Sequence, residues 1–142
     1  MDEKHFMIST DKSRLDIETI HAYLSERSYW AQGRTLEAVR TSIANSLCFG
    51  VYGRDGRLAG FARVLSDFTV FAYLMDVFIL EEYRGKGLGR RLIATILNYP
   101  DLRGLKRWQL ITSNAHALYR PFGFAELAAP EKHMEKVDAA RR

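Results

Sequence analysis

The sequence has a single cysteine and no long apolar run, and each of these shortages excludes a class of protein. Its one cysteine, Cys48, can form neither an internal disulfide nor a cysteine-rich zinc site. The longest apolar stretch, residues 68–80, is too short to span a bilayer and contains Asp76. The first residues show no apolar block before a small-residue cleavage site, so we expect no export signal. These features predict a cytoplasmic protein with no membrane segment and no metal.

What remains is an ordinary composition for a globular chain, with 47% hydrophobic and 27% charged residues in 142 positions. It predicts a single domain over residues 1–142, with 138–142 as a frayed tail, and it excludes intrinsic disorder. The formal net charge of +4 is unevenly distributed. Between positions 84 and 107 the chain has seven basic residues, Arg84, Lys86, Arg90, Arg91, Arg103, Lys106 and Arg107, against the single acid Asp101. We therefore expect the anion-attracting surface of the protein to lie in this segment.

Apolar periodicity and turn residues predict the order of secondary structure. Asp16 and Thr35 are expected to cap two early helices, and Asp55-Gly56 is expected to form a hairpin turn. Strands are predicted at 5–10, 48–53, 57–66, 71–80, 108–112 and 124–127, and 133–137 could add an edge strand; helices are predicted at 17–24, 36–47, 88–98 and 115–122. The almost wholly apolar segment 71–80 is expected to be buried on both faces. The order β-α-α-β-β-β-α-β-α-β predicts an α/β (α+β) fold with a mixed, mostly antiparallel central sheet flanked by helices.

A glycine-rich turn between the predicted strand 71–80 and the next helix is the strongest functional signal. It reads Arg84-Gly85-Lys86-Gly87-Leu88-Gly89. Glycines let backbone amides approach an anion closely, and the first turn of the helix adds unpaired N–H groups. The alternative interpretation is a flexible surface turn in a basic patch. A dinucleotide fingerprint would need glycine where Arg90 stands, and no Gly-Lys-Ser/Thr is present for a nucleoside triphosphate.

The pattern that is present, Arg84-x-x-Gly87-x-Gly89, resembles the acetyl-CoA signature of the GNAT superfamily of N-acetyltransferases. A second segment, Ala115-His116-Ala117-Leu118-Tyr119-Arg120-Pro121-Phe122-Gly123-Phe124, is similar to the ending that this superfamily carries downstream of the signature. The two early helices followed by a hairpin also match the order of elements in the superfamily. The resemblance covers nearly the whole chain and implies a GNAT acyl-CoA N-acyltransferase fold.

The resemblance also implies roles for individual residues. The pyrophosphate of coenzyme A would be held by Arg84, Gly85, Lys86, Gly87, Leu88, Gly89 and Arg90, largely through backbone N–H groups. Val77, Phe78 and Ile79 would pair with the pantetheine arm, which requires their strand to splay or bulge away from a neighbour. Tyr119 matches the tyrosine that meets the sulfur, so its phenol could protonate the departing thiolate. The alternative is that Tyr119 is a structural aromatic.

The roles of Asp76 and of Trp30 each allow two interpretations. Asp76 lies in an apolar strand, where it could act as the base or the amine ligand, or form a buried salt bridge with Arg63. Tyr29, Trp30 and Arg34 lie where the superfamily varies its acceptor pocket, and they could bind the substrate. Trp30 could instead fill the core beneath its loop.

Together these observations predict an enzyme that moves an acetyl group from acetyl-CoA to a primary amine of a small molecule or of an amino terminus. Direct attack in a ternary complex is expected, because no activated nucleophile is evident. The alternative is a non-catalytic acyl-CoA-binding module of the same fold. A nucleic-acid-binding domain ranks last, because the chain lacks a helix-turn-helix and an exposed aromatic platform. A homodimer remains open.

Overall fold

The computed structural model describes residues 5–138 and contains one five-stranded sheet in the order β1-β2-β3-β4-β5. Its strands are β1 (Met7–Ser9), β2 (Leu47–Tyr52), β3 (Leu58–Ser66), β4 (Phe71–Ile79) and β5 (Arg107–Gln109). Neighbouring strands are antiparallel except for the parallel pair β4 and β5. The predicted mixed, mostly antiparallel sheet is therefore confirmed.

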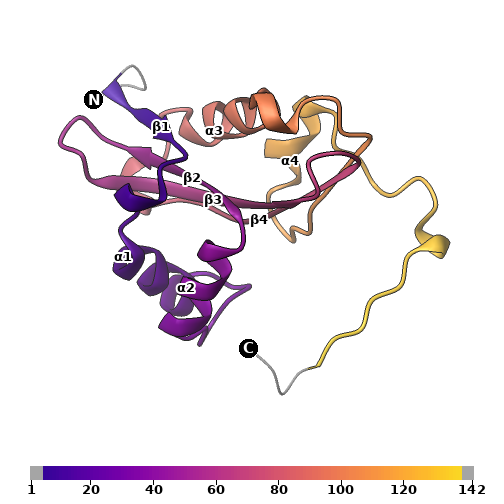
Figure 1. The fold of residues 1–142 in the computed structure, drawn as a ribbon, viewed down its shortest axis with the longest axis horizontal. Helices are drawn as coiled ribbons and strands as arrows, with labels where there is room; N and C mark the ends of the chain where they lie inside the picture. Colours follow the sequence, from indigo (N-terminus) through magenta and orange to yellow (C-terminus); the bar gives the residue numbers. More distant parts are fainter. Residues whose placement is uncertain (1–4, 139–142) are drawn as a thin grey trace.

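Helices cover both faces of this sheet (Figure 1). They are α1 (Ile17–Ala22), continued by a π-helical turn (Tyr23–Arg27), α2 (Leu36–Ala44), α3 (Leu88–Leu97) and α4 (His116–Tyr119), continued by a 3-10 turn (Arg120–Phe122). In Figure 1, α1 and α2 lie on one side of the sheet, and α3 and α4 lie on the other. Within residues 5–138, no helix is long and apolar enough to cross a membrane.

Local side-chain chemistry starts the two early helices where the sequence predicts. The Asp16 side chain accepts a hydrogen bond from the Thr19 amide at 3.1 Å, and the Thr35 hydroxyl accepts one from the Ala38 amide at 3.1 Å. Each bond satisfies one of the amides that the first turn of a helix leaves without a backbone partner. Both capping predictions are confirmed.

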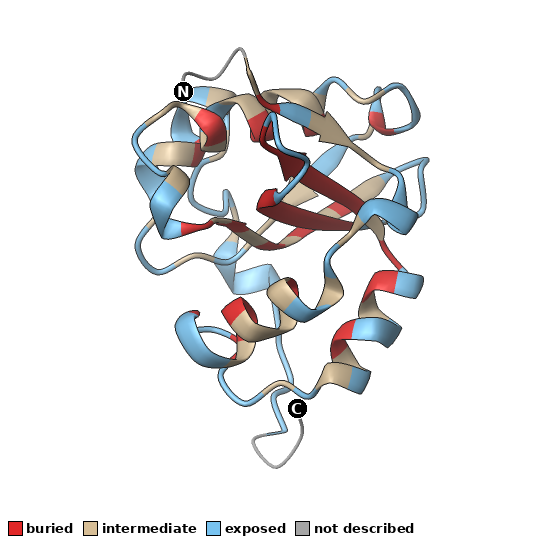
Figure 2. Ribbon diagram, turned by 90° about the vertical axis from the view of Figure 1, so that its left-hand side faces the viewer, coloured by how far each residue is buried: buried red, intermediate tan, exposed pale blue. Residues whose placement is uncertain are grey.

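Two apolar cores lie on the two faces of the sheet. One core joins α3 to the sheet and includes Leu88, Leu92, Ile93 and Ile96, and the other joins α1 and α2 to the sheet. Figure 2 shows the buried residues concentrated in the central strands and on the inner faces of the helices. The sheet is therefore a rigid layer on which both helical layers are fixed.

Strand β4 contains a bulge at its middle. Phe61 and Arg63 of β3 are two positions apart, yet they pair with Phe78 and Met75 of β4, which are three apart. One extra residue is thus accommodated at Asp76, whose φ of 53° lies in the left-handed region. The bulge changes which face the following side chains occupy, and it supplies the local distortion of this strand that the family resemblance requires.

Strands β4 and β5 separate soon after they meet. They pair only at Phe71, Ala72 and Tyr73, so the second half of β4 has no strand beside it on that edge. Alternate residues of β4 are consequently half-buried, and the expectation of a strand buried on both faces is wrong. Tyr73, Val77 and Ile79 are among these half-buried residues, and each lines a cleft.

The C-terminal part of the chain departs most from the sequence-based expectation. The predicted strands 124–127 and 133–137 are wrong, since neither segment joins the sheet in the described chain. A strand requires a partner for its backbone groups, and within residues 5–138 neither segment pairs with a strand. Strand β5 is also shorter than the predicted 108–112. Of the predicted frayed tail, residues 139–142 lie outside the described residues.

Candidate active site

A cleft of about 530 Å³ lies where β4 and β5 separate, between the glycine-rich turn and α4. Its wall includes residues from five parts of the fold: Tyr23, Arg27, Ser28, Tyr29 and Trp30; Val77, Phe78 and Ile79; Glu81, Tyr83, Arg84 and Gly85; Gly87, Leu88 and Gly89; and Asn114, Ala115, Leu118 and Tyr119. The two segments in which the family resemblance was found thus meet at one site.

The glycine-rich turn borders this cleft in a conformation that requires glycine. Gly85 and Gly87 have φ values of 80° and 79°, where a side chain would be strained. Gly87 also precedes the first residue of α3, and no side chain caps this helix. The amides of Leu88 and Gly89 therefore begin a helix at the cleft wall, where an anion is stabilised by N–H groups and by the helix dipole.

Strand β4 turns the peptide groups of Ile79 toward the cleft and away from β3. The Leu80 amide donates to the Ala59 carbonyl on β3 at 2.8 Å, so strand alternation turns the Ile79 peptide groups away from β3. The Ile79 carbonyl indeed accepts from Arg84 Nε at 2.8 Å instead of from β3. Because the N–H and C=O of one strand residue point the same way, the Ile79 amide faces the cleft as well.

Tyr23 is a cleft residue that the sequence analysis missed. Its ring stacks on Phe78 with centroids 4.1 Å apart, and its hydroxyl accepts from Arg84 Nη2 at 2.7 Å. Arg84 is thereby held against both the end of β4 and the turn after α1. The helical spacing that places Ile20 and Leu24 inward also places Tyr23 inward, and this signal could have identified it.

Tyr119 lies on the wall of the cleft at the C-terminal end of α4. Its side chain is buried, and its ring contacts the ring of Phe124 edge-on at 5.8 Å. Burial, with a smaller effect of the nearby Tyr29, raises the pKa of Tyr119 to about 12. The phenol is therefore protonated throughout the neutral range and can act as a proton donor.

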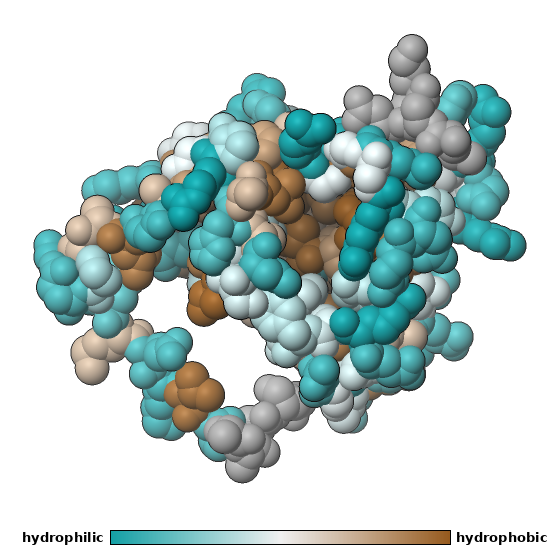
Figure 3. Space-filling model, turned by 180° about the vertical axis from the view of Figure 1, so that it is seen from behind, coloured by the Kyte–Doolittle hydropathy of each residue, from teal (hydrophilic) through white to brown (hydrophobic). Residues whose placement is uncertain are grey.

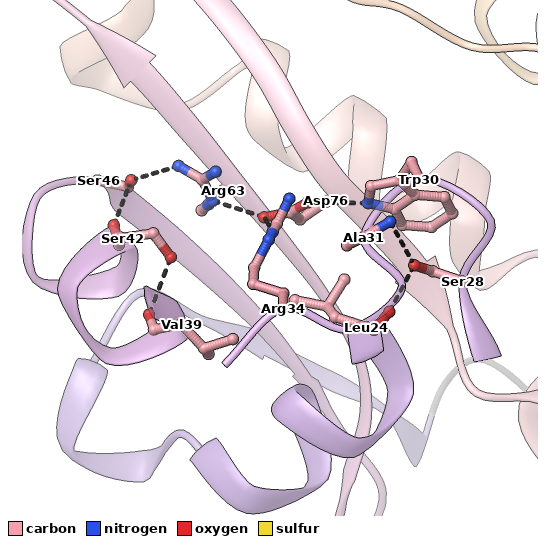
Figure 4. A network of polar contacts seen from close by, with 10 residues as sticks. All are labelled: Leu24, Ser28, Trp30, Ala31, Arg34, Val39, Ser42, Ser46, Arg63 and Asp76. Atoms are coloured by element: carbon pink, nitrogen blue, oxygen red, sulfur yellow. Dashed lines mark hydrogen bonds and ion pairs between the residues drawn. The ribbon is translucent and has the colours of Figure 1, made fainter. Parts of the chain in front are cut away.

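Asp76 is the centre of a buried polar network (Figure 4). Its Oδ2 accepts from Arg63 Nε at 2.7 Å and from Arg34 Nη1 at 2.8 Å, and its Oδ1 accepts from Trp30 Nε1 at 2.8 Å. Arg63 continues the network by donating to the Ser46 hydroxyl at 3.0 Å. The salt bridge between Asp76 and Arg63, one of the two interpretations of this aspartate, is confirmed.

The segment between α1 and α2, residues 28–34, is attached to the rest of the site at two places. Trp30 and Arg34 bind Asp76 as described, and the Tyr29 hydroxyl accepts from the Ser113 amide at 2.9 Å. This second bond crosses from the helical layer to the loop after β5, and it lowers the pKa of Tyr29. Trp30 and Tyr29 both remain partly exposed at the cleft, with 38% and 50% of their surface accessible.

The cleft brings together most, but not all, of the residues that the sequence singles out. Lys86, Arg90, Arg34 and Asp76 are outside its wall. Lys86 lies within the glycine-rich turn and Arg90 directly follows it, whereas Arg34 and Asp76 lie behind Trp30. Glu81 does line the cleft, where it pairs with Arg27 at 2.9 Å. Within the described residues, no three His, Cys, Asp or Glu side chains gather where a metal ion could be held.

Comparison with known proteins gives a consistent result. A family model described as "Acetyltransferase (GNAT) family" matches residues 17–124. A Gibberella zeae protein named "Putative acetyltransferase" is 30% identical over 135 residues, which cover 80% of this chain and 75% of that protein. Streptothricin acetyltransferase of Streptomyces lavendulae is 36% identical over 87 residues, or 58% of this chain and 46% of that enzyme.

Comparison with solved structures leads to the same family. The crystal structure of a "putative acetyltransferase belonging to the gnat family" from Xanthomonas campestris is 46% identical and superposes with a TM-score of 0.92 over 94% of each chain. Spermidine N-acetyltransferase from Vibrio cholerae, solved in complex with CoA and spermine, is 21% identical with a TM-score of 0.71, covering 89% of this chain and 84% of that one. This second likeness concerns the fold alone. The sequence family, its signature turn and the fold coincide, and the chain belongs to the acetyltransferase (GNAT) family.

Proposed function

We propose that this protein transfers an acetyl group from acetyl-CoA to a primary amine of a small molecule or of an amino terminus. The observation that carries the proposal is the cleft itself, where an uncapped helix start, the free edge of β4 and a buried phenol share one wall. Acetyl-CoA, when bound, supplies the acetyl group as a thioester. The Vibrio cholerae enzyme, solved in complex with CoA and the amine spermine, supports this choice of donor and acceptor.

The chain's own groups fit coenzyme A. Its pyrophosphate would be held by the glycine turn, where the amides of Leu88 and Gly89 start α3 and Arg84 and Lys86 add positive charge. The pantetheine arm would lie along residues 77–79, where β4 has no neighbouring strand. Of the two β4 amides proposed to stabilise the carbonyl oxygen, Phe78 and Ile79, the orientation of the backbone supports Ile79. One such donor contributes ~2.7–4 kcal/mol.

Tyr119 is the proposed general acid. A phenol with a pKa of about 12 keeps its proton at neutral pH and can give it to the sulfur as the thiolate leaves. An acyl-enzyme is not part of the proposal, because the one thiol, Cys48, is buried and has its pKa raised to about 11 by burial. Direct attack by the amine is the route that these residues support.

The proposed acceptor site is the segment of residues 28–34, with Tyr29 and Trp30 at the cleft. Arg34 and Asp76 would act through Trp30 and not by direct contact with substrate. Both oxygens of Asp76 already accept hydrogen bonds from three cationic or indole donors, so its ion-pair role is better supported than a role as base. We therefore propose Asp76 as a positioning residue that fixes Trp30 against the bulge of β4.

Steady-state release of coenzyme A in the presence of a panel of amines tests the function. Turnover above background with any amine supports the enzyme, whereas tight CoA binding without turnover supports the alternative of a non-catalytic acyl-CoA-binding module. Tyr119→Phe tests the mechanism: kcat should fall by about 10²–10⁴, the usual contribution of a general acid, while acetyl-CoA affinity stays within about twofold. Tyr83→Phe removes a phenol from the same cleft and serves as the control. An unchanged kcat in Tyr119→Phe would remove the acid role.

A further inference from the structure

The proposed reaction needs a group that takes a proton from the amine, and the residues described so far do not supply one. A primary alkylamine has a pKa of ~10.4, so at neutral pH almost all of it carries a third proton and has no lone pair for attack. Tyr119 holds a proton and cannot take another. Both oxygens of Asp76 already accept hydrogen bonds. A second proton-transfer group must therefore lie elsewhere in the cleft wall.

Most other titratable side chains of this wall are already engaged. Glu81, the one carboxylate of the described wall, pairs with Arg27 at 2.9 Å. The Tyr23 hydroxyl accepts from Arg84 Nη2 at 2.7 Å. The ring of Tyr83 packs against the apolar cores on both faces of the sheet. The titratable side chains that remain in the described wall are two phenols, Tyr29 and Tyr119.

Histidines and carboxylates from the C-terminal part of the chain lie outside this wall. His116, Glu126, His133 and Glu135 line a second cleft of about 640 Å³, which shares with the first only Tyr119 among the described residues. Residues 133–137 run outward from the body of the protein (Figures 1 and 3). None of these groups is placed to take a proton from an amine in the first cleft.

Tyr29 is fixed at the cleft by contacts at both ends of its side chain. Its ring contacts the Trp30 ring edge-on, with centroids 5.1 Å apart, and Trp30 is itself held by its bond to Asp76. Its hydroxyl oxygen accepts from the Ser113 amide at 2.9 Å. The phenol is therefore held in one orientation at the wall, as a group that must meet a substrate atom requires.

The bond from Ser113 determines what the Tyr29 oxygen can do. The amide donates to this oxygen, so one lone pair is used, and a second lone pair and the proton of the phenol remain. About half of the Tyr29 surface is accessible, so this proton has a path to water. Hydrogen bonding with the Ser113 side chain and amide lowers the pKa of Tyr29, which favours release of the proton.

Tyr29 and Tyr119 have opposite environments in one cleft. Burial raises the pKa of Tyr119 to about 12, and the nearby Tyr29 adds to this effect. Hydrogen bonding moves the pKa of Tyr29 in the other direction. Two groups whose pKa values are pushed apart are suited to opposite roles in proton transfer. Tyr119 is thus suited to give a proton, and Tyr29 is suited to take one.

We infer that Tyr29 is a second catalytic residue, which takes the proton from the charged amine of the acceptor. This role rests on the proposed acetyl transfer. The Tyr29 oxygen accepts one proton from the ammonium nitrogen while its own proton passes to water, so the phenol is restored. The freed lone pair then forms the bond from nitrogen to the carbonyl carbon, and the bond from this carbon to sulfur breaks.

The protons balance in this scheme. The nitrogen loses two protons in becoming an amide. The first reaches water through Tyr29. The sulfur receives the proton of Tyr119, and the second proton from nitrogen replaces it on that phenol. One proton is therefore released for each acetyl group transferred. The acceptor that this arrangement serves is an alkylamine that is charged at neutral pH.

Tyr29→Phe tests the role, because it keeps the ring beside Trp30 and removes the oxygen. With an alkylamine that gives turnover, kcat/KM at neutral pH should fall by about 10²–10⁴, the usual contribution of a proton-transfer residue. At about pH 10 the loss should shrink to less than about tenfold, because much of the amine is then neutral without help. Tyr99→Phe removes a phenol outside both clefts and should change neither value. An equal loss in Tyr29→Phe at both pH values would indicate a merely structural role and would overturn the inference.

Direct titration of the phenol needs no acetyl transfer. In NMR spectra of protein with isotope-labelled tyrosine rings, the signal that Tyr29→Phe removes belongs to Tyr29. This signal should titrate below 10.0 and before that of Tyr119. Titration at or above 10.0, or after Tyr119, would overturn the inference. No turnover with any amine would overturn the proposed function and this role together, even where the titration is as expected.

Discussion

Replacement of Gly87 by alanine tests the anion cradle, and the chain offers a matched control. Gly87 and Gly104 both have φ of 79°, but Gly104 lies in a turn outside the wall of the candidate active-site cleft. An L-residue in this conformation costs roughly 1–2 kcal/mol, of which the stiffer unfolded chain offsets ~0.4–1. Each variant should therefore lose about 1 kcal/mol of unfolding free energy, which lowers Tm by about 4 °C in a domain of this size.

The two variants should differ in cofactor affinity. A methyl group at Gly87 shifts the backbone from which the amides of Leu88 and Gly89 point toward the cleft. Loss of one charge-assisted hydrogen bond, ~1.5–3 kcal/mol, should weaken CoA binding by about 10- to 150-fold in Gly87→Ala. Titration calorimetry with coenzyme A measures the effect, and Gly104→Ala should bind as the unchanged protein does. Equal affinities of the two variants would refute an amide cradle at this turn.

Three other substitutions examine the network around the site and the buried thiol. Asp76→Asn should cost ~3–5 kcal/mol of unfolding free energy, because it leaves the guanidinium groups of Arg34 and Arg63 without their carboxylate partner. Glu126→Gln breaks an exposed ion pair and should cost less than ~1 kcal/mol. Similar losses for the two variants in urea titrations would contradict the reasoning that burial makes the Asp76 pairs costly to break. Trp30→Phe should raise KM for the acceptor about tenfold and leave CoA affinity unchanged, and a change in CoA affinity alone would move Trp30 out of the acceptor site. Burial raises the pKa of Cys48 from 9.0 to about 11, so on raising the pH the thiol of the unfolded state loses its proton first. The free energy of unfolding should therefore fall between pH 9 and 11. Cys48→Ala should flatten this part of the plot of Tm against pH in thermal melts.

Features that depend on neighbouring residues could be predicted from the sequence. The caps at Asp16 and Thr35, the Asp55-Gly56 turn between β2 and β3, and the glycine-rich start of α3 each follow from side-chain or backbone chemistry within a few positions. The aspartate in an apolar strand also indicated a buried ion pair, because an unpaired carboxylate there would be too costly.

Features that depend on distant parts of the chain could not be predicted. The bond from Ser113 to Tyr29 joins residues 84 positions apart, and no local pattern marks either of them. The bulge at Asp76 is visible only in the register of β3 against β4. The segments 124–127 and 133–137 have suitable strand composition, but a strand exists only with a partner, and residues 5–138 pair no strand with either segment.

The bulge in β4 has a consequence for redesign of this enzyme fold. Leu74 and Val77, three positions apart, both pack toward α3, while Phe78 packs toward α1 and α2. Removing one residue at Asp76 would restore plain alternation and exchange the inward and outward sets over the last three residues of the strand. Variants that aim to alter the proposed acceptor site should therefore keep the length of β4 constant, together with the Trp30 and Arg34 contacts to Asp76.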